Sequence, residues 1–172
     1  MNQHASGPPS GKPGPVSLRP EQPDDEAFLF AVYASTREDE LAITGWDEAT
    51  RLAFLNMQFR AMQVGYRGSF PQAQFSIVLC DGRPVGRLVV DRTGNEIHVV
   101  DVALLPASRN RGIGTVLMRD LCVEAENCGK PIRLRVLKHS PALRFYQRLG
   151  FKPIEDFDFD EQMEWRPGSR EH

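Results

Sequence analysis

The stretch Arg109–Met118, RNRGIGTVLM, constrains the fold of this chain more than any other segment. Two glycines one residue apart, Gly112 and Gly114, follow two arginines and lead into an apolar pattern at helical spacing. A glycine-rich turn that opens a helix presents free backbone N–H groups and a favourable dipole to an anion. The segment therefore predicts a phosphate-binding turn at the start of a helix.

The size and charge of the chain narrow its function class. Its 172 residues have the length of one ordinary domain with a substantial core, and its formal net charge is −2. The basic excess that is typical of nucleic-acid binding is therefore missing. No segment approaches the length of an apolar membrane span, and residues 1–15 lack a cationic start followed by an apolar run. We expect no nucleic-acid partner, no membrane and a cytoplasmic location.

The cysteines indicate a reducing environment. They are odd in number, lack CxxC spacing and fall inside apolar segments or at a helix end: Cys80, Cys122 and Cys128. This pattern is typical of reduced core thiols and predicts neither a disulfide framework nor a metal site.

Composition and hydrophobic period divide the chain into segments. Residues 1–15 are rich in Gly, Pro and Ser and carry no large apolar side chain after Met1, which predicts a disordered tail. One domain is expected over 16–167, with a short C-terminal tail over 168–172.

The hydrophobic period predicts seven strands and four helices. The expected strands are 16–19, 75–80, 85–90, 96–105, 132–137, 151–154 and 162–165. The first expected helix covers 27–35, and the second is capped by Asp47. The third runs from the glycine turn to about 127, and the fourth runs from Pro141 to Gly150.

The order of these elements excludes two common architectures. Strand, two helices, three strands, helix, strand, helix and two strands is neither a regular βαβα alternation nor an all-β sandwich. Gly65, Gly68 and Pro71 predict a loop over 65–71 that ends the second helix. The fold class is therefore α+β, a single domain with a mixed, mostly antiparallel sheet of about six or seven strands flanked by about four helices.

The glycine turn carries a named resemblance. Arg109-x-x-Gly112-x-Gly114, placed directly after an expected strand, is similar to the R/Q-x-x-G-x-G/A signature of the GNAT superfamily of acyl-CoA-dependent N-acyltransferases. Other phosphate motifs fit worse, because the chain has no GxxxxGK[ST] and carries Leu117 where a dinucleotide fingerprint has its third glycine.

A second motif supports the same family. The segment Ala142-x-x-Phe145-Tyr146-x-x-x-Gly150-Phe151 resembles the late A-x-x-F-Y-x-x-x-G-F segment of GNAT enzymes. Both motifs lie at the expected places in the order of strands and helices, and the resemblance extends over residues 16–165. The chain is identified by this resemblance as a GNAT N-acetyltransferase.

The resemblance implies acetyl-CoA as the acyl donor and no metal. The backbone N–H groups that would cradle its pyrophosphate belong to Asn110, Arg111, Gly112, Ile113, Gly114 and Thr115, with charge added by Arg109 and Arg111. Its pantetheine arm would pair, as an added strand, with Val102, Ala103 and Leu104, and the N–H of Leu104 would polarise the thioester carbonyl. His139 stands where many family members carry an asparagine that touches the cofactor.

Catalytic roles follow from the same resemblance. Tyr146 stands where the family places the tyrosine that protonates the departing thiolate, although it would also serve as a core aromatic. An alkyl ammonium is less than about one part in a thousand neutral at pH 7, so a base is expected. The candidates are Glu96, His98 and Asp101, of which His98 has the spacing of a family glutamate; a water chain is the alternative. Strand alternation puts Glu96 and His98 on one face and Asp101 on the other, unless a bulge intervenes.

The acceptor half is less defined. Acidic clusters at 38–40 and 155–161 would steer a cationic amine or form solvated loops. By analogy with the family, the first helix pair and residues 65–74 would wall the acceptor, a small-molecule or peptide amine attacked directly, in a possible homodimer. Two alternatives remain at this point, a catalytically inactive acyl-CoA-binding sensor and a nucleotide-binding oxidoreductase that binds NAD(P).

Overall fold

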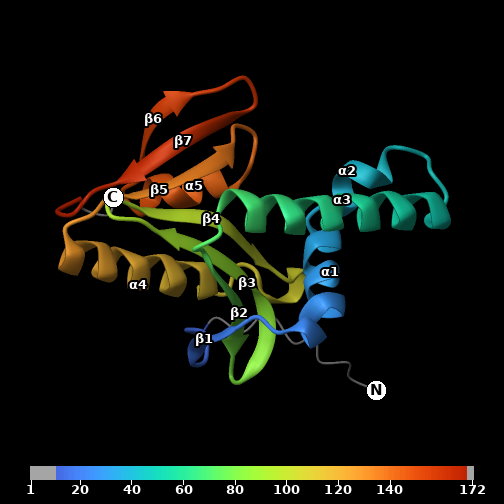
Figure 1. Cartoon of the computed structure of the whole chain (residues 1–172), viewed down its shortest axis with the longest axis horizontal. Helices are drawn as coiled ribbons and strands as arrows, with labels where there is room; N and C mark the ends of the chain where they lie inside the picture. Colours follow the sequence, from blue (N-terminus) through green and yellow to red (C-terminus); the bar gives the residue numbers. More distant parts are fainter. Residues whose placement is uncertain (1–10, 170–172) are drawn as a thin grey trace, which may run out of the picture.

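The computed structural model describes residues 11–169, which form seven strands and five α-helices (Figure 1). The remaining residues, 1–10 and 170–172, hold most of the expected N-terminal tail and part of the C-terminal one and lie outside the described residues. The strands are β1 (Val16–Pro20), β2 (Gln74–Cys80), β3 (Arg83–Arg92), β4 (Ile97–Leu104), β5 (Ile132–Leu137), β6 (Lys152–Asp156) and β7 (Asp160–Trp165). The helices are α1 (Glu26–Ser35), α2 (Glu38–Ala42), α3 (Glu48–Ser69), α4 (Ile113–Cys128) and α5 (Ala142–Arg148).

The strands form one sheet in the order β1-β2-β3-β4-β5-β7-β6. All neighbours run antiparallel except β4 and β5. This confirms the expected mixed, mostly antiparallel sheet and the α+β class. The short helix α2 was not expected, and it brings the helices of the described chain to five.

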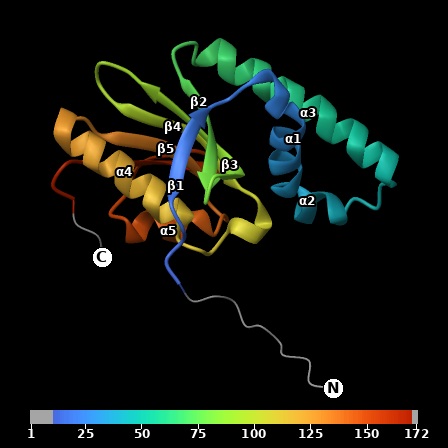
Figure 2. The same cartoon turned by 90° about the horizontal axis from the view of Figure 1, so that it is seen from below.

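Two cores cover the two faces of the sheet (Figure 2). On one face, α4 and α5 pack on the sheet through buried residues such as Leu117, Leu121 and Leu149. On the other face, α1 and α3 pack on β2 through Leu29, Phe59 and Ile77. The apolar periodicity of the helices therefore places them on opposite sides of the sheet.

Helix α3 is longer than its sequence predicts. Asp47 caps its start as expected, accepting a hydrogen bond of 2.8 Å from the N–H of Thr50. The helix then continues through Gly65 and Gly68 to Ser69, so the expected loop over 65–71 is wrong. Tertiary contacts near the end of the helix offset the low helix propensity of glycine: Arg67 donates to Glu21 at 2.9 Å and lies 4.3 Å from the centre of the Phe75 ring.

Replacement of Gly65 by alanine is expected to stabilise the protein by about 1 kcal/mol. A Cβ at this position meets no atom within 4 Å, so the gain in helix propensity comes without a steric cost. Urea denaturation measures the effect. The matched control is Gly45→Ala, which is also free of contacts but has a φ of +70° and is expected to destabilise the fold. A lower stability of Gly65→Ala would contradict the expectation.

Strand β4 contains a bulge at Val100. Val99 pairs with Val90 and Asp101 pairs with Val89, so Val100 is the extra residue. The bulge brings Asp101 to the face that carries His98, because one inserted residue reverses the alternation. Both side chains lie toward α3, since the His98 ring is 5.1 Å from that of Phe70 and Asp101 lines a cavity with Tyr66. Simple alternation, which separates these two residues, therefore fails here, and the bulge is the reason.

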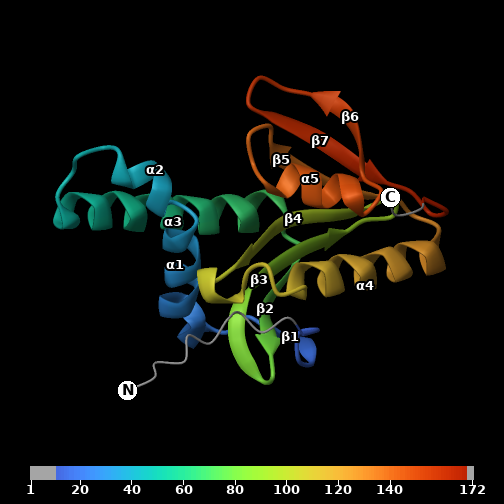
Figure 3. The same cartoon turned by 180° about the vertical axis from the view of Figure 1, so that it is seen from behind.

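Strands β4 and β5 separate beyond the bulge. Their parallel pairing covers only residues 97–99 of β4 and 132–134 of β5. Figure 3 shows the result, with β5, β6 and β7 splayed from the other strands and α5 lying at the opening. The end of β4 is therefore left with an edge that has no strand partner on the β5 side.

The three cysteines form no disulfide among residues 11–169, and they differ in exposure. Cys80 is buried, Cys122 is half-buried and Cys128 is exposed, so only the first is a core thiol in the full sense. No group of His, Cys, Asp and Glu in residues 11–169 has an arrangement that would hold a metal ion. None of the helices in that range has the length and apolar character that a membrane span needs.

Candidate active site

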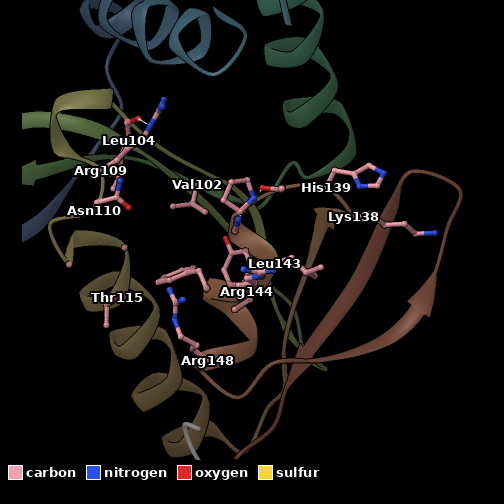
Figure 4. A pocket seen from close by; sticks show the side chains of 17 residues that line it. Val102, Leu104, Arg109, Asn110, Thr115, Lys138, His139, Leu143, Arg144 and Arg148 are labelled. Atoms are coloured by element: carbon pink, nitrogen blue, oxygen red, sulfur yellow. Dashed lines mark hydrogen bonds between the residues drawn. The ribbon is translucent and has the colours of Figure 1, made fainter. Parts of the chain in front are cut away.

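A groove of about 960 Å³ opens where β4 and β5 separate (Figure 4). The end of β4, the glycine turn before α4, and α5 with the residues before it form its walls. The predicted site residues that line it are Val102, Leu104, Arg109, Asn110, Gly112, Gly114, Thr115, His139 and Tyr146. Those that the structure places elsewhere are His98, Asp101, Ala103, Arg111 and Ile113.

The glycine turn presents backbone donors to this groove. Asn110 and Gly112 have φ angles of 57° and 83°, which bend the chain sharply before α4 begins at Ile113. No side chain caps the helix, and the first N–H groups of a helix have no acceptor within it. The Ile113 side chain is buried in the core, so only its backbone is available to a ligand. The turn can therefore hold an anion such as a phosphate.

The guanidinium of Arg109 contacts protein groups. Its Nε donates to the carbonyl of Leu104 at 2.9 Å and its Nη2 donates to the Ser35 hydroxyl at 3.1 Å. Figure 4 shows the side chain directed toward Leu104. Arg109 therefore ties the turn to the end of β4 and to α1, and Arg111 is exposed outside the groove lining.

Tyr146 belongs to the core and to the groove at once. It is 6% exposed and packs against the rings of Phe145 and Phe151, with centroids 5.1 and 5.5 Å away. Burial raises its pKa to about 12, with a smaller contribution from the charge of Asp101. The phenol is therefore protonated at neutral pH and can donate a proton into the groove.

The three candidate bases have different surroundings. Glu96 is engaged by Arg133 at 2.7 Å. Burial lowers the pKa of His98, whose ring packs on Phe70 and lines neither the groove nor the cavity beside α3. Burial raises the pKa of Asp101, opposed by Arg87 at 4.0 Å and by the Val102 N–H. Of the three, Asp101 has the surroundings that best suit a proton acceptor near neutral pH.

Comparison with known proteins decides the family. The model of the acetyltransferase (GNAT) domain matches residues 71–153, which contain the glycine turn and Tyr146. An uncharacterised N-acetyltransferase of Methanocaldococcus jannaschii is 27% identical over 109 residues, covering 62% of this chain and 69% of that protein. Residues 71–153 thus match a GNAT acetyltransferase domain.

Solved structures share the GNAT fold. The PaiA N-acetyltransferase of Thermoplasma acidophilum, solved in complex with coenzyme A, superposes with a TM-score of 0.67 at 18% identity, covering 88% of this chain and 99% of that one. An acetyltransferase of Thermus thermophilus gives a TM-score of 0.62, also at 18% identity, with 88% and 96% covered. The fold is thus retained at low sequence identity.

One position within the matched domain departs from the family pattern. His139, in place of the usual asparagine, is exposed at the rim of the groove. Figure 4 shows it and Lys138 pointing away from Thr115. Lys138 forms an ion pair with Asp156, and this hydrogen bond raises the pKa of the lysine. Neither side chain is directed at the glycine turn.

Two arginines of the groove were missed at the sequence level. Arg144 and Arg148 lie four residues apart on α5, are exposed and line the groove. Figure 4 shows Arg148 on the side of α5 that faces Thr115. The sequence does contain a pattern that could have indicated them, namely two arginines at helical spacing on either side of Tyr146.

Replacement of Gly112 by alanine is expected to weaken acetyl-CoA binding about tenfold. Gly112 has a φ of +83°, and a left-handed conformation costs a residue with a Cβ about 1–2 kcal/mol. The alanine variant is therefore expected to relax this turn in the free protein, so that binding must restore it at that cost. The added Cβ also meets Pro13 Cδ at 3.3 Å. Isothermal titration calorimetry measures the affinity, with Gly94→Ala as the control because that glycine meets no atom within 4 Å. Equal affinity of Gly112→Ala and the unchanged protein would refute the role of the turn.

Proposed function

We propose that this GNAT protein transfers the acetyl group of acetyl-CoA directly to the primary amine of a small molecule or peptide. One observation carries the proposal: a single groove gathers the open end of β4, the glycine turn and the protonated phenol of Tyr146. An acyl-CoA offers partners to all three, namely the amides of pantetheine, a pyrophosphate and a thiolate leaving group.

The backbone would hold the cofactor. Leu105 donates its N–H to Val85 of β3, so the N–H of the preceding residue, Leu104, points toward the groove. It is suited to hydrogen-bond the thioester carbonyl. The turn before α4 would bind the pyrophosphate, and Arg144 and Arg148 would add charge to the phosphate end. Coenzyme A in the Thermoplasma acidophilum structure, which shares this fold, supports the choice of ligand.

Tyr146 and Asp101 would move the protons. The amine nitrogen attacks the thioester carbonyl carbon, and Asp101 accepts the proton that the nitrogen loses. The C–S bond then breaks, and the departing thiolate takes a proton from the Tyr146 hydroxyl. The products are the acetylated amine and coenzyme A, and no acyl group is attached to the protein at any step.

A coupled screen tests the proposal. Release of the coenzyme A thiol from acetyl-CoA is followed with polyamines, amino acids, aminoglycosides and peptide N-termini as acceptors. Thermal shift with acetyl-CoA, coenzyme A, NAD and ATP is measured in parallel. We expect stabilisation by acetyl-CoA and thiol release with at least one acceptor. Stabilisation without any turnover would instead support the acyl-CoA sensor, and stabilisation by NAD alone would support an oxidoreductase.

A further inference from the structure

A second cavity lies on the other side of β4. It has a volume of about 120 Å³ and lies between α1 with the two residues that follow it, α3, β3 and β4. Val102 and Leu104 face the groove, whereas Asp101 and Ala103 line this cavity, as expected for alternating residues of one strand. Its volume exceeds the ~30 Å³ of one water severalfold, so it can hold a small organic head group.

Arg87 of β3 lines the cavity, and two of its donors are unsatisfied. Its side chain is only 3% exposed, and its Nε and Nη2 have no hydrogen-bond partner among the described residues. Two carboxylates lie at ion-pair distance, Glu21 Oε2 at 3.5 Å from Nη2 and Asp101 Oδ2 at 4.0 Å from Nη1. Glu21 Oε2 itself has no hydrogen bond, so an acceptor lies next to Nη2, whereas no acceptor among the described residues is within hydrogen-bond distance of Nε. Buried guanidinium donors are almost always paired, and a ligand in the cavity could supply the missing acceptor.

The charged residues of the cavity wall favour a ligand that carries both a positive and a negative charge. Arg37 and Arg87 are its cations and Asp101 is its one anion in the described chain, and the remaining lining residues are aromatic, apolar or uncharged. Outside the wall, Glu40 pairs with Arg37 at 3.1 Å and Glu21 lies 3.5 Å from Arg87. A bare ammonium at Asp101 would still lie beside the Arg87 guanidinium, which is 4.0 Å from Asp101 Oδ2. A ligand that also carries a carboxylate would offset this repulsion and would accept a hydrogen bond from the guanidinium.

We propose that this cavity binds the acetyl acceptor as an amino acid, with its carboxylate on Arg87 and its amine beside Asp101. The proposal rests on the acetyl transfer described above and names its substrate class. The 4.0 Å between Arg87 Nη1 and Asp101 Oδ2 suits two charged groups attached to one carbon, which lie equally close together. Leu29, Met62 and Tyr66 would then contact the side chain of the amino acid.

Matched acceptor pairs test this inference. Glycine, alanine, leucine and phenylalanine are compared with the amines that lack their carboxylate and with the corresponding amino acid amides. We expect at least one amino acid to have a KM at least tenfold below that of its amine, with the amide near the amine. Binding of the same compounds is measured by calorimetry in the presence of coenzyme A, so the comparison does not depend on turnover.

Two substitutions test whether Arg87 binds the carboxylate of the amino acid or only supports the fold. Arg87→Lys is expected to raise the KM of the amino acid at least tenfold with an unchanged Kd of acetyl-CoA. Glu21→Gln is the control, because Glu21 contacts Arg87 without lining the cavity, and it is expected to keep the preference for the carboxylate. If Arg87→Lys does not fold, the inference is tested by the KM and binding values of the matched acceptor pairs with the unchanged protein.

The outcomes distinguish this inference from the proposed function. Equal binding of amines and amino acids would overturn the inference while acetyl transfer stands. Loss of the preference in Glu21→Gln as well as in Arg87→Lys would also overturn it, since Arg87 would then act through the ion-pair network. Absence of thiol release with every compound would contradict the proposed function, whereas the binding preference would still be read from calorimetry.

Discussion

Tyr146→Phe is expected to lower kcat by about 10²–10⁴-fold and to leave the Kd of acetyl-CoA unchanged. The substitution removes one oxygen and keeps the ring that packs between Phe145 and Phe151, so the core is preserved. The thiolate then leaves without a proton donor. Steady-state kinetics and calorimetry with acetyl-CoA measure the two quantities, and thermal unfolding checks that the variant is folded.

Two outcomes would contradict the assignment of Tyr146. An unchanged kcat would mean that the residue is only a core aromatic, which its 6% exposure also allows. A loss of acetyl-CoA affinity in parallel with kcat would assign the hydroxyl to cofactor binding and not to proton transfer.

Asp101→Asn is expected to lower kcat/KM by about 10²–10⁴-fold, because the amide cannot accept the proton of the amine. The pH profile gives a second readout. Burial raises the pKa of Asp101 above its usual 3.8, so the activity of the unchanged protein falls as the pH decreases through that raised value and the carboxylate becomes protonated. This acid limb is expected to disappear in Asp101→Asn.

His98→Gln is the matched control for this substitution. Its ring packs on Phe70 and lies outside both the groove and the cavity, so little change in kcat/KM is expected. A larger loss in His98→Gln than in Asp101→Asn would reverse the assignment of the base. The charged and titratable groups near Asp101 are Arg37, Arg87, Tyr33, Tyr66 and Tyr146. Burial raises the pKa of Tyr66 and of Tyr146 to about 12, so these two phenols stay neutral through the acid limb.

Local sequence determines the half of the site that we propose for the cofactor. The turn at Gly112 and the strand over residues 132–137 could be predicted because their signals come from neighbouring residues, a pair of glycines and a run of apolar residues. Helix α3 could not be predicted as far as Ser69. Its last turns depend on Glu21 and Phe75, which are distant in sequence and contact Arg67 only in the folded chain.

The acceptor half depends on a register shift that the sequence does not encode locally. Asp101 moves to the face of His98 because Val100 has no partner on β3, and strand alternation alone predicts the opposite. The sequence shows Arg87 only as a charged residue within the apolar run of β3. Its place beside two carboxylates becomes known only from the folded positions of Glu21 and Asp101. Long-range packing therefore decides which charges meet in the cavity.

The bulge at Val100 has a consequence for how this protein can diverge. Beyond it, the alternate side chains of β4 line two different spaces: Val102 and Leu104 line the groove that we propose for the donor, and Asp101 and Ala103 line the cavity that we propose for the acceptor. A substitution at Ala103 or at Met62 of α3 would reshape the acceptor compartment, and the backbone that pairs with the donor would stay in place. If the proposed function holds, single substitutions can therefore change acceptor selectivity while the thioester remains held in the same way.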